Sequence, residues 1–167
     1  MADVTDERSR IRLVVLFGGQ SAEHDVSCVT ARHVVSAADP ARYRIEPVGI
    51  TRDGTWVRAE DARAALARGV AALPDALAAD GTSIDHETAI VPAGVDETVV
   101  VFPLLHGPMR EAGTVQGLLE QAGVPYVGSG VLGSAVAMDK PTAKKLLAFD
   151  GIPQARWLDY RRSDLTE

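Results

Sequence analysis

Residues 12–27 read RLVVLFGGQSAEHDVS. The short apolar run Arg12–Phe17 is typical of a buried strand, and Gly18-Gly19 ends it. From about Glu23 to Ala38 the pattern becomes helical, until Asp39-Pro40 ends the helix. In this pattern Val26, Thr30, His33, Val34 and Ala37 fall on one face of the helix. The stretch therefore predicts a strand, a glycine-containing loop and a helix, which is the opening unit of an α/β fold.

Strand and helix patterns alternate along the rest of the chain. Further strands are predicted at 44–50, 55–58, 98–105, 125–127 and 152–160, and further helices at 113–122, 131–137 and 141–149. Asp53-Gly54 is a hairpin turn between the first two of these strands. The Ala-rich segment 59–97 is predicted to hold two short helices and no chemistry, with His86 in a solvated loop. The alternation predicts an α/β fold with an open, mostly parallel sheet and flanking helices.

Length and composition exclude several classes of protein. With 167 residues, 46% of them hydrophobic, the chain can bury a core, and one domain plus a fragment is expected. A net charge of −6 argues against nucleic-acid binding. The single cysteine, Cys28, is expected in the core and cannot form an internal disulfide, which favours the cytoplasm. Residues 1–10 are predicted to be a disordered tail, and no run reaches the roughly 18 apolar residues of a membrane span.

Three distinctive loops each follow a predicted strand. They are GGQSAEHD at 18–25, HGPMREAG at 106–113 and GSG at 128–130. The carboxyl ends of strands in an open parallel sheet share one edge, and ligands bind there. The loops are therefore predicted to converge on a ligand site, although neither a dinucleotide-binding fingerprint nor a phosphate loop of the P-loop type is present.

These loops and the helix after the third contain the candidate site residues. Glu23 either complements a helix dipole or holds a cationic group at the sheet edge. His106 directly follows a buried strand, so its ring either faces the edge or is structural, and His24 is assigned a structural role. Lys140, one of three lysines that all lie between 140 and 145, either pairs with Asp139 on the surface or reaches a phosphate.

Taken together, the loops resemble the D-alanine–D-alanine ligase family of the ATP-grasp superfamily. FGGQSAEHDVS at 17–27 is similar to its first motif, LHGP at 105–108 with EAGTVQG at 111–117 to its second, and YVGSGVLGSAVAMDK at 126–140 to its third. The resemblance runs from Arg12 to Tyr160 in the family's order. It implies a substrate-binding, Rossmann-like pre-ATP-grasp domain over 11–134 and the truncated start of a central ATP-grasp domain over 135–167.

The resemblance also implies an activity and residue roles. The family joins two D-alanines with ATP through an acyl phosphate, for peptidoglycan precursors. By resemblance, Glu23 holds the ammonium of the first D-alanine, Val26 forms an apolar wall beside it, His106 lies near its carboxylate, and Lys140 contacts ATP. Mg²⁺ or Mn²⁺ is implied, with ligands beyond the end of this chain, and so is a homodimer.

The chain departs from the family pattern in two ways. Arg110-Glu111-Ala112-Gly113 stands where the family usually has Gly-Glu-Asp-Gly, and Arg110 would strain a left-handed position by about 1–2 kcal/mol. The sequence also stops at Glu167, so the chain alone is expected to be inactive. Three alternatives remain: a D-alanine–D-lactate ligase variant, a non-catalytic remnant that serves as a binding or dimerisation module, and a nucleotide-binding regulatory domain.

Overall fold

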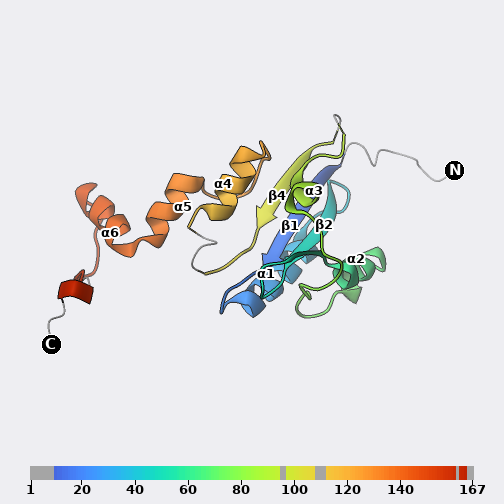
Figure 1. Cartoon of the computed structure of the whole chain (residues 1–167), viewed down its shortest axis with the longest axis horizontal. Coiled ribbons are helices and arrows are strands. Elements are labelled where there is room, and N and C mark those ends of the chain that lie inside the picture. Colours follow the sequence, from blue (N-terminus) through green and yellow to red (C-terminus); the bar gives the residue numbers. More distant parts are fainter. Residues whose placement is uncertain (1–9, 95–96, 108–111, 161, 165–167) are drawn as a thin grey trace.

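The computed structural model describes residues 10–94, 97–107, 112–160 and 162–164. Within these residues, four strands form one sheet in the order β3-β2-β1-β4 (Figure 1). Their bounds are Ile11–Gly18 for β1, Tyr43–Ile50 for β2, Trp56–Arg58 for β3 and Val99–Pro103 for β4. β1 is parallel to both β2 and β4, whereas β3 returns antiparallel along β2. The predicted open, mostly parallel sheet and the hairpin at Asp53-Gly54 are confirmed.

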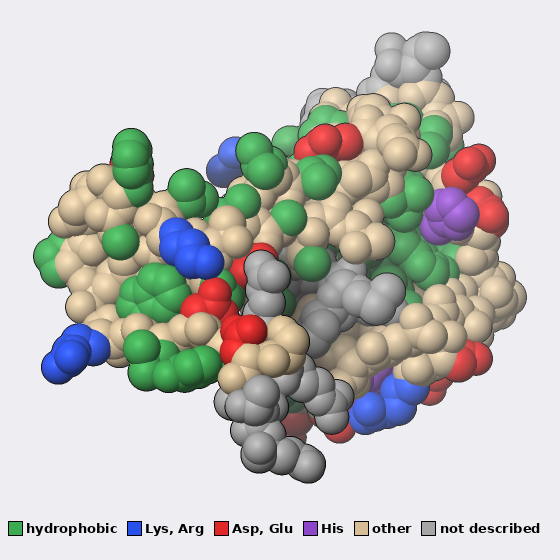
Figure 2. Space-filling view, turned by 60° about the vertical axis from the view of Figure 1, so that its left-hand side comes forward, with side chains coloured by type: hydrophobic (Ala, Val, Ile, Leu, Met, Phe, Trp, Pro, Cys, Tyr) green, Lys and Arg blue, Asp and Glu red, His purple; other side chains and the backbone are tan. Residues whose placement is uncertain are grey.

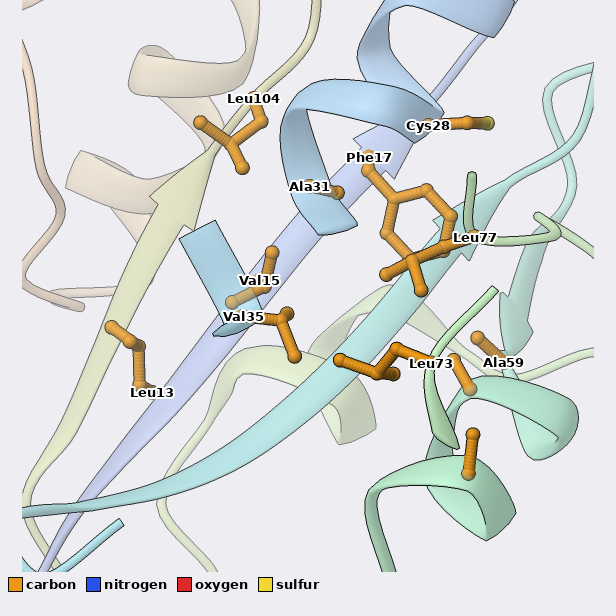
Figure 3. Close-up of a cluster of buried hydrophobic side chains, with 12 residues drawn as sticks. Leu13, Val15, Phe17, Cys28, Ala31, Val35, Ala59, Leu73, Leu77 and Leu104 are labelled. Atoms are coloured by element: carbon orange, nitrogen blue, oxygen red, sulfur yellow. The ribbon is translucent and has the colours of Figure 1, made fainter. Parts of the chain in front are cut away.

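Helices lie on both faces of this sheet (Figure 1). Their bounds are His24–Ala37 for α1, Glu60–Ala67 for α2, His86–Ile90 for α3, Thr114–Gln121 for α4, Val131–Met138 for α5 and Lys140–Phe149 for α6. Side chains alternate along β1: Leu13, Val15 and Phe17 pack toward α1 and α2, as Figure 3 shows, and Val14 and Leu16 pack on the opposite side. The alternation gives one core on each face. Within the described residues, no helix is both long and apolar enough to cross a membrane.

The buried face of α1 differs from the predicted one. The buried residues are His24, Ser27, Cys28, Ala31 and Val35. Val26, which the pattern grouped on the apolar face, is 56% exposed. The pattern failed because it sorted residues by apolarity, whereas the sheet accepts small side chains and polar ones that find backbone partners.

The segment between β3 and β4 contributes to both cores. Leu73 and Leu77 belong to the core under α1, and Ala89 and Ile90 to the core on the other face. His86 begins α3 and is half-buried, with its ring centroid 6.1 Å from that of Trp56, so its assignment to a solvated loop was wrong. The two short helices predicted here, α2 and α3, are confirmed.

A buried arginine holds the end of α3 to the sheet. Arg12 is 6% exposed, and its Nε lies 2.5 Å from Oε2 of Glu46. Its two terminal nitrogens donate to the carbonyl oxygens of Ala89, at 2.9 Å, and Val91, at 3.1 Å. The guanidinium therefore forms an ion pair with the Glu46 carboxylate and donates hydrogen bonds to two backbone carbonyls near the end of α3.

The chain beyond the third loop extends away from the sheet (Figure 1). The predicted strand at 125–127 is reduced to one parallel bridge between Val101 and Tyr126, and residues 152–160 form no strand. A strand requires a neighbour to pair with, and the described chain provides none for 152–160. No residue of α6 is buried, and apolar side chains lie on the surface of this part, including Phe149 at 90% exposed (Figure 2). The division into domains 11–134 and 135–167 stays a prediction, as does disorder of residues 1–10, of which 1–9 lie outside the described residues.

Candidate functional site

The three loops meet at the carboxyl edge of the sheet, as their sequence positions predict. The amide of Gly19, just after β1, donates to the carbonyl of Ile50 at the end of β2, at 2.6 Å. The amide of Leu104, just after β4, donates to the carbonyl of Leu16 at 2.8 Å. Val127, at the start of the third loop, donates to Val101 of β4 at 2.9 Å. Backbone hydrogen bonds therefore anchor each loop at this edge.

The first two loops touch at Gly107. Its φ is +94°, and a Cβ built on it would lie 2.6 Å from Oγ of Ser21 and 3.2 Å from Oε2 of Glu23. Only glycine allows so close an approach with this backbone angle. The carboxylate of Glu23 is thus held beside the backbone that follows His106, and two of the predicted site residues are brought together.

A buried serine of α1 links the first two loops through hydrogen bonds. The amide of Gly18 donates to Oγ of Ser27 at 2.7 Å, and that hydroxyl donates to the carbonyl of Leu104 at 2.5 Å. Ser27 is fully buried on α1. One side chain therefore links the ends of β1 and β4 to the helix that starts at the site. Sequence reasoning missed this role, and the only signal was a serine one helical turn after Glu23.

Glu23 is the N-cap residue of α1, one position before the first turn where the sequence placed it. Its amide donates to Oγ of Ser21 at 2.9 Å, which shapes the turn, while its own side chain makes no capping hydrogen bond. The Glu23 side chain is exposed. The carboxylate is therefore open to a ligand at the positive end of a helix.

His24 and Cys28 both have structural roles. Nδ1 of His24 lies 2.9 Å from the carbonyl oxygen of Gly19, and the residue is buried, so the ring is not directed to solvent. Burial, with a smaller contribution from the charge of Asp25, raises the pKa of the Cys28 thiol to about 11. A thiol with this pKa stays protonated near neutrality and is a poor nucleophile. Cys28 lies in the core, as predicted.

His106 lies between the Glu23 loop and a cavity of about 400 Å³. The imidazole is half-buried, with its Nε2 atom buried. The cavity is also lined by Gln116 of α4, by Gly128 and Ser129 of the third loop, and by Met138 of α5. The second and third loops are therefore joined through this cavity, and Gln116 and Ser129 are lining residues that sequence reasoning did not single out.

The segments on either side of the third loop contact α4 and the end of the second loop. The hydroxyl of Tyr126 donates to Oε1 of Glu120 on α4 at 2.6 Å, and this bond raises the pKa of the tyrosine. A Cβ at Gly113, whose φ is +93°, would lie 2.7 Å from the carbonyl oxygen of Val131. The start of α5 thus packs directly on the end of the second loop. Arg110 and Glu111 lie outside the described residues, whereas Ala112 is half-buried just before this contact.

Lys140 begins α6, two residues after the cavity-lining Met138. Asp139 caps the helix by accepting the amide of Thr142 at 3.2 Å, and none of the ion pairs within the described residues involves Lys140. The predicted surface pair of Lys140 with Asp139 is therefore not formed.

The two neighbouring lysines do have partners. Nζ of Lys145 lies 3.3 Å from Asp159, and Nζ of Lys144 lies 5.9 Å from the centre of the Trp157 ring. Among the three lysines, Lys140 is the one whose ammonium is open to an anion. In the part of the chain that the structure describes, no three His, Cys, Asp or Glu side chains are grouped to hold a metal ion.

Val26 is on the exposed side of α1, three residues after Glu23. Residues three apart on a helix are neighbours on its surface. Its position is compatible with an apolar wall beside the Glu23 carboxylate.

Comparison with known proteins gives consistent matches. The family described as "D-ala D-ala ligase N-terminus" matches residues 12–129. A D-alanine–D-alanine ligase from Rhodococcus erythropolis is 49% identical over 161 residues, which cover 87% of this chain and 43% of the relative. The structure of the D-alanine–D-alanine ligase from Coxiella burnetii is similar with a TM-score of 0.71 at 31% identity, covering 95% of this chain and 47% of that one.

A second solved structure is that of a Bacillus anthracis D-alanine–D-alanine ligase complexed with ATP. It has a TM-score of 0.60 and 29% identity, and the match covers 94% of this chain and 42% of that one. The chain thus spans less than half the length of each of these relatives.

Proposed function

The chain belongs to the D-alanine–D-alanine ligase family, and on this premise we propose that it is the substrate-binding part of an ATP-dependent enzyme that joins two D-alanines for peptidoglycan precursors. One observation carries the proposal: the Glu23 carboxylate lies against Gly107, the residue next to His106. A carboxylate and an imidazole held at one sheet edge suit the ammonium and carboxylate of a small amino acid.

Each site residue has a role that its surroundings permit. The exposed Glu23 carboxylate accepts charge-assisted hydrogen bonds from the ammonium of the first D-alanine. The imidazole of His106 donates to the carboxylate of the same molecule, and Val26 packs against its methyl group. Such two-ended binding fixes the orientation of the carboxylate that is to react, which lowers the entropic part of the barrier.

The reaction that we propose has two chemical steps. The carboxylate of the first D-alanine attacks the terminal phosphorus of ATP, which yields an acyl phosphate and ADP. The amine of the second D-alanine then attacks the acyl carbon, and phosphate leaves. Negative charge grows on oxygen atoms in both steps, so cationic groups provide much of the stabilisation.

Within this chain, the contribution to those steps is binding and orientation. Lys140, whose ammonium is open, is proposed to contact ATP phosphate as a compact positive charge. The described residues do not offer a metal site, and we propose that the ligands of Mg²⁺ or Mn²⁺ lie outside this chain.

The substrate role of Glu23 is tested by D-alanine binding to the 167-residue chain, measured by NMR titration. Glu23→Gln removes the charge but keeps the size of the side chain, and it should weaken D-alanine at least tenfold. Asp25→Asn is the matched control, because Asp25 is also an acid at the start of α1, in an exposed pair with Arg52 at 2.7 Å. Equal losses in both variants would show a general electrostatic effect and would contradict the proposal.

The ligase activity is tested on the product of the complete reading frame. If the frame continues past Glu167, that product should release phosphate from ATP only when D-alanine is present, whereas the 167-residue chain should release none. A stop codon directly after Glu167 would remove the enzyme proposal for this protein. D-alanine-dependent phosphate release by the 167 residues alone would contradict the division of roles between this chain and the rest.

We also propose a homodimer in the cytoplasm. The support is the family resemblance together with Cys28, which is buried and unpaired. Light scattering after gel filtration of the complete product tests the dimer, and fractionation of the host cell tests the location. A monomer at micromolar concentration would contradict the first proposal.

A further inference from the structure

A second pocket lies at the amino end of the parallel strands, opposite the edge where the three loops meet. It measures about 570 Å³, and four arginines line it: Arg12, Arg44, Arg58 and Arg63. Arg12 and Arg44 are register partners at the second positions of β1 and β2, and Arg58 is the last residue of β3. The alternation of side chains along the strands puts these three on the face that α3 covers. Arg63 joins them from α2.

Two of these arginines are already neutralised. Arg12 is the most buried charged residue of the wall, and it pairs with Glu46 at 2.5 Å and with Glu97 at 3.6 Å. Glu97 also forms an ion pair with Arg44. Two guanidinium groups and two carboxylates therefore balance one another, and their contacts hold this part of the wall in place.

The other two arginines, Arg58 and Arg63, form no ion pair within the residues that the structure describes. The diagonal neighbour of Arg58 on β2 is Glu46, which Arg12 engages. Glu60, three residues before Arg63 on α2, accepts the amide of Thr82 at 3.0 and 3.2 Å. The hydrogen bonds with Thr82 lower the pKa of Glu60 more than the charge of Arg63 does. The acids placed to pair with these two arginines are thus engaged elsewhere.

The rest of the wall combines one acid with apolar side chains. Among the described residues, Glu87 is the one lining carboxylate outside any ion pair. The apolar side chains include Ile84 and Val91. Among the groups without an ion pair, two positive charges therefore stand against one negative charge. This surplus favours an anion, and the volume leaves room for an organic body attached to it.

We propose that this pocket binds the dianion of a small phosphate monoester, with Arg58 and Arg63 donating to the phosphate oxygens and Ile84 and Val91 packing against the organic part. A phosphate monoester has three terminal oxygens and nearly two negative charges near neutrality, so one group can bind both arginines. The planar guanidinium fork suits such oxygens. The proposal does not depend on the ligase activity, because the pocket lies at the other end of the sheet.

Two phosphate esters separate binding of the dianion from general attraction of anions. Methyl phosphate is a dianion at about pH 8, because its second pKa is about 6, whereas dimethyl phosphate carries one charge and two terminal oxygens. The reporter is the methyl signal of Ile84 in protein labelled with ¹³C at the isoleucine methyls, at constant ionic strength, and Ile152, outside the pocket, is the internal reference. Methyl phosphate should shift the Ile84 signal saturably, with a dissociation constant about fivefold or more below that of dimethyl phosphate.

Charge-removing variants test the assigned residues. Arg58→Gln and Arg63→Gln should each weaken methyl phosphate about fivefold or more. Arg68→Gln is the matched control, because Arg68 is exposed at the end of α2 and does not line the pocket, and it should bind as the parent does. Glu87→Gln removes the opposing charge and should strengthen binding about twofold or more. Urea unfolding confirms that all four variants are folded.

Three results would overturn the proposal. Equal binding of the two esters would show that the pocket does not select a dianion. Equal losses in Arg63→Gln and Arg68→Gln would show that only the net charge of the chain matters. Absence of any saturable shift at Ile84 would show that the pocket does not bind a phosphate monoester.

Discussion

Replacing Gly107 by alanine should break the contact that joins the first two loops. The new Cβ would lie 2.6 Å from Oγ of Ser21 and 3.2 Å from Oε2 of Glu23, and the first distance is far below van der Waals contact. A non-glycine residue at φ +94° costs about 1–3 kcal/mol, and overpacking adds about 1–3 kcal/mol. Part of this cost is relieved if Ser21 and Glu23 move by roughly half an ångström, which displaces the carboxylate.

Two assays follow these effects. Urea unfolding reports the free energy of unfolding, and NMR titration reports the affinity for D-alanine, which should fall about tenfold because the carboxylate is misplaced. Gly69→Ala is the matched control: Gly69 has φ +106° and no atom within 4 Å of its added Cβ. It bears the backbone cost without a clash and follows α2, outside the three loops, so it should not change D-alanine affinity.

A double variant isolates the clash. Ser21→Gly in the Gly107→Ala background removes the hydroxyl and the Cβ that the new methyl meets, so part of the lost stability should return. If Gly107→Ala costs no more than Gly69→Ala and binds D-alanine like the parent, then the two loops do not meet as described. The role assigned to their contact would then be wrong.

Three further predictions concern the scaffold around the site. Ser27→Ala should cost about 2–4 kcal/mol, because it leaves a buried amide and a buried carbonyl unpaired, whereas Ser36→Ala on the same helix, which removes one bond to a carbonyl, should cost under about 1 kcal/mol in urea unfolding. Arg12→Ala should cost about 3–5 kcal/mol, since it removes the partner of the half-buried Glu46 carboxylate and of the carbonyls of Ala89 and Val91. Exposed Arg52→Ala should cost about 1 kcal/mol or less, and similar losses in urea unfolding would refute the distinction. The Cys28 pKa near 11 leaves about one thiol in a thousand ionised at pH 8, so alkylation should be slow until the chain is unfolded. The pKa of Cys28 is higher in the folded chain than in the unfolded one. The protonated thiol therefore contributes fully to the free energy of unfolding below about pH 9, and this contribution is lost as the pH rises from about 9 toward 11.

The elements of the sheet could be predicted because their signals are local. β1 and β4 are short, largely apolar runs that end at Gly18 and Pro103, and the hairpin turn after β2 needs only Asp53-Gly54. Two predictions failed because strand formation is not local. Residues 152–160 have strand-like composition but no partner within the described chain, and Pro125–Val127 pairs only through Tyr126.

The candidate site was predicted in part. Glu23 and His106 stood out because each follows a strand, and a parallel sheet brings such positions to one edge. Gln116 did not, because its place in the helical pattern of α4 says nothing about whether its amide finds a partner. The apolar face that the pattern identified on α1 is not its buried face, for a related reason. His24 is buried because its ring pairs with a carbonyl in the preceding loop, which the pattern of α1 alone does not show.

The order of β1, α1, β2, β3 and β4, the class of the sheet and the edge where three loops converge all follow from the pattern of residues along the chain. Hydrophobic period, turn residues and the geometry of parallel sheets act over short stretches or follow from topology, so they can be read from the chain. Which atoms meet at this edge depends on tertiary packing: Ser27 meets a carbonyl 77 residues away, and Glu23 meets Gly107. Such contacts depend on the position and rotation of each helix on the sheet. Close packing of segments that are distant in the sequence sets both.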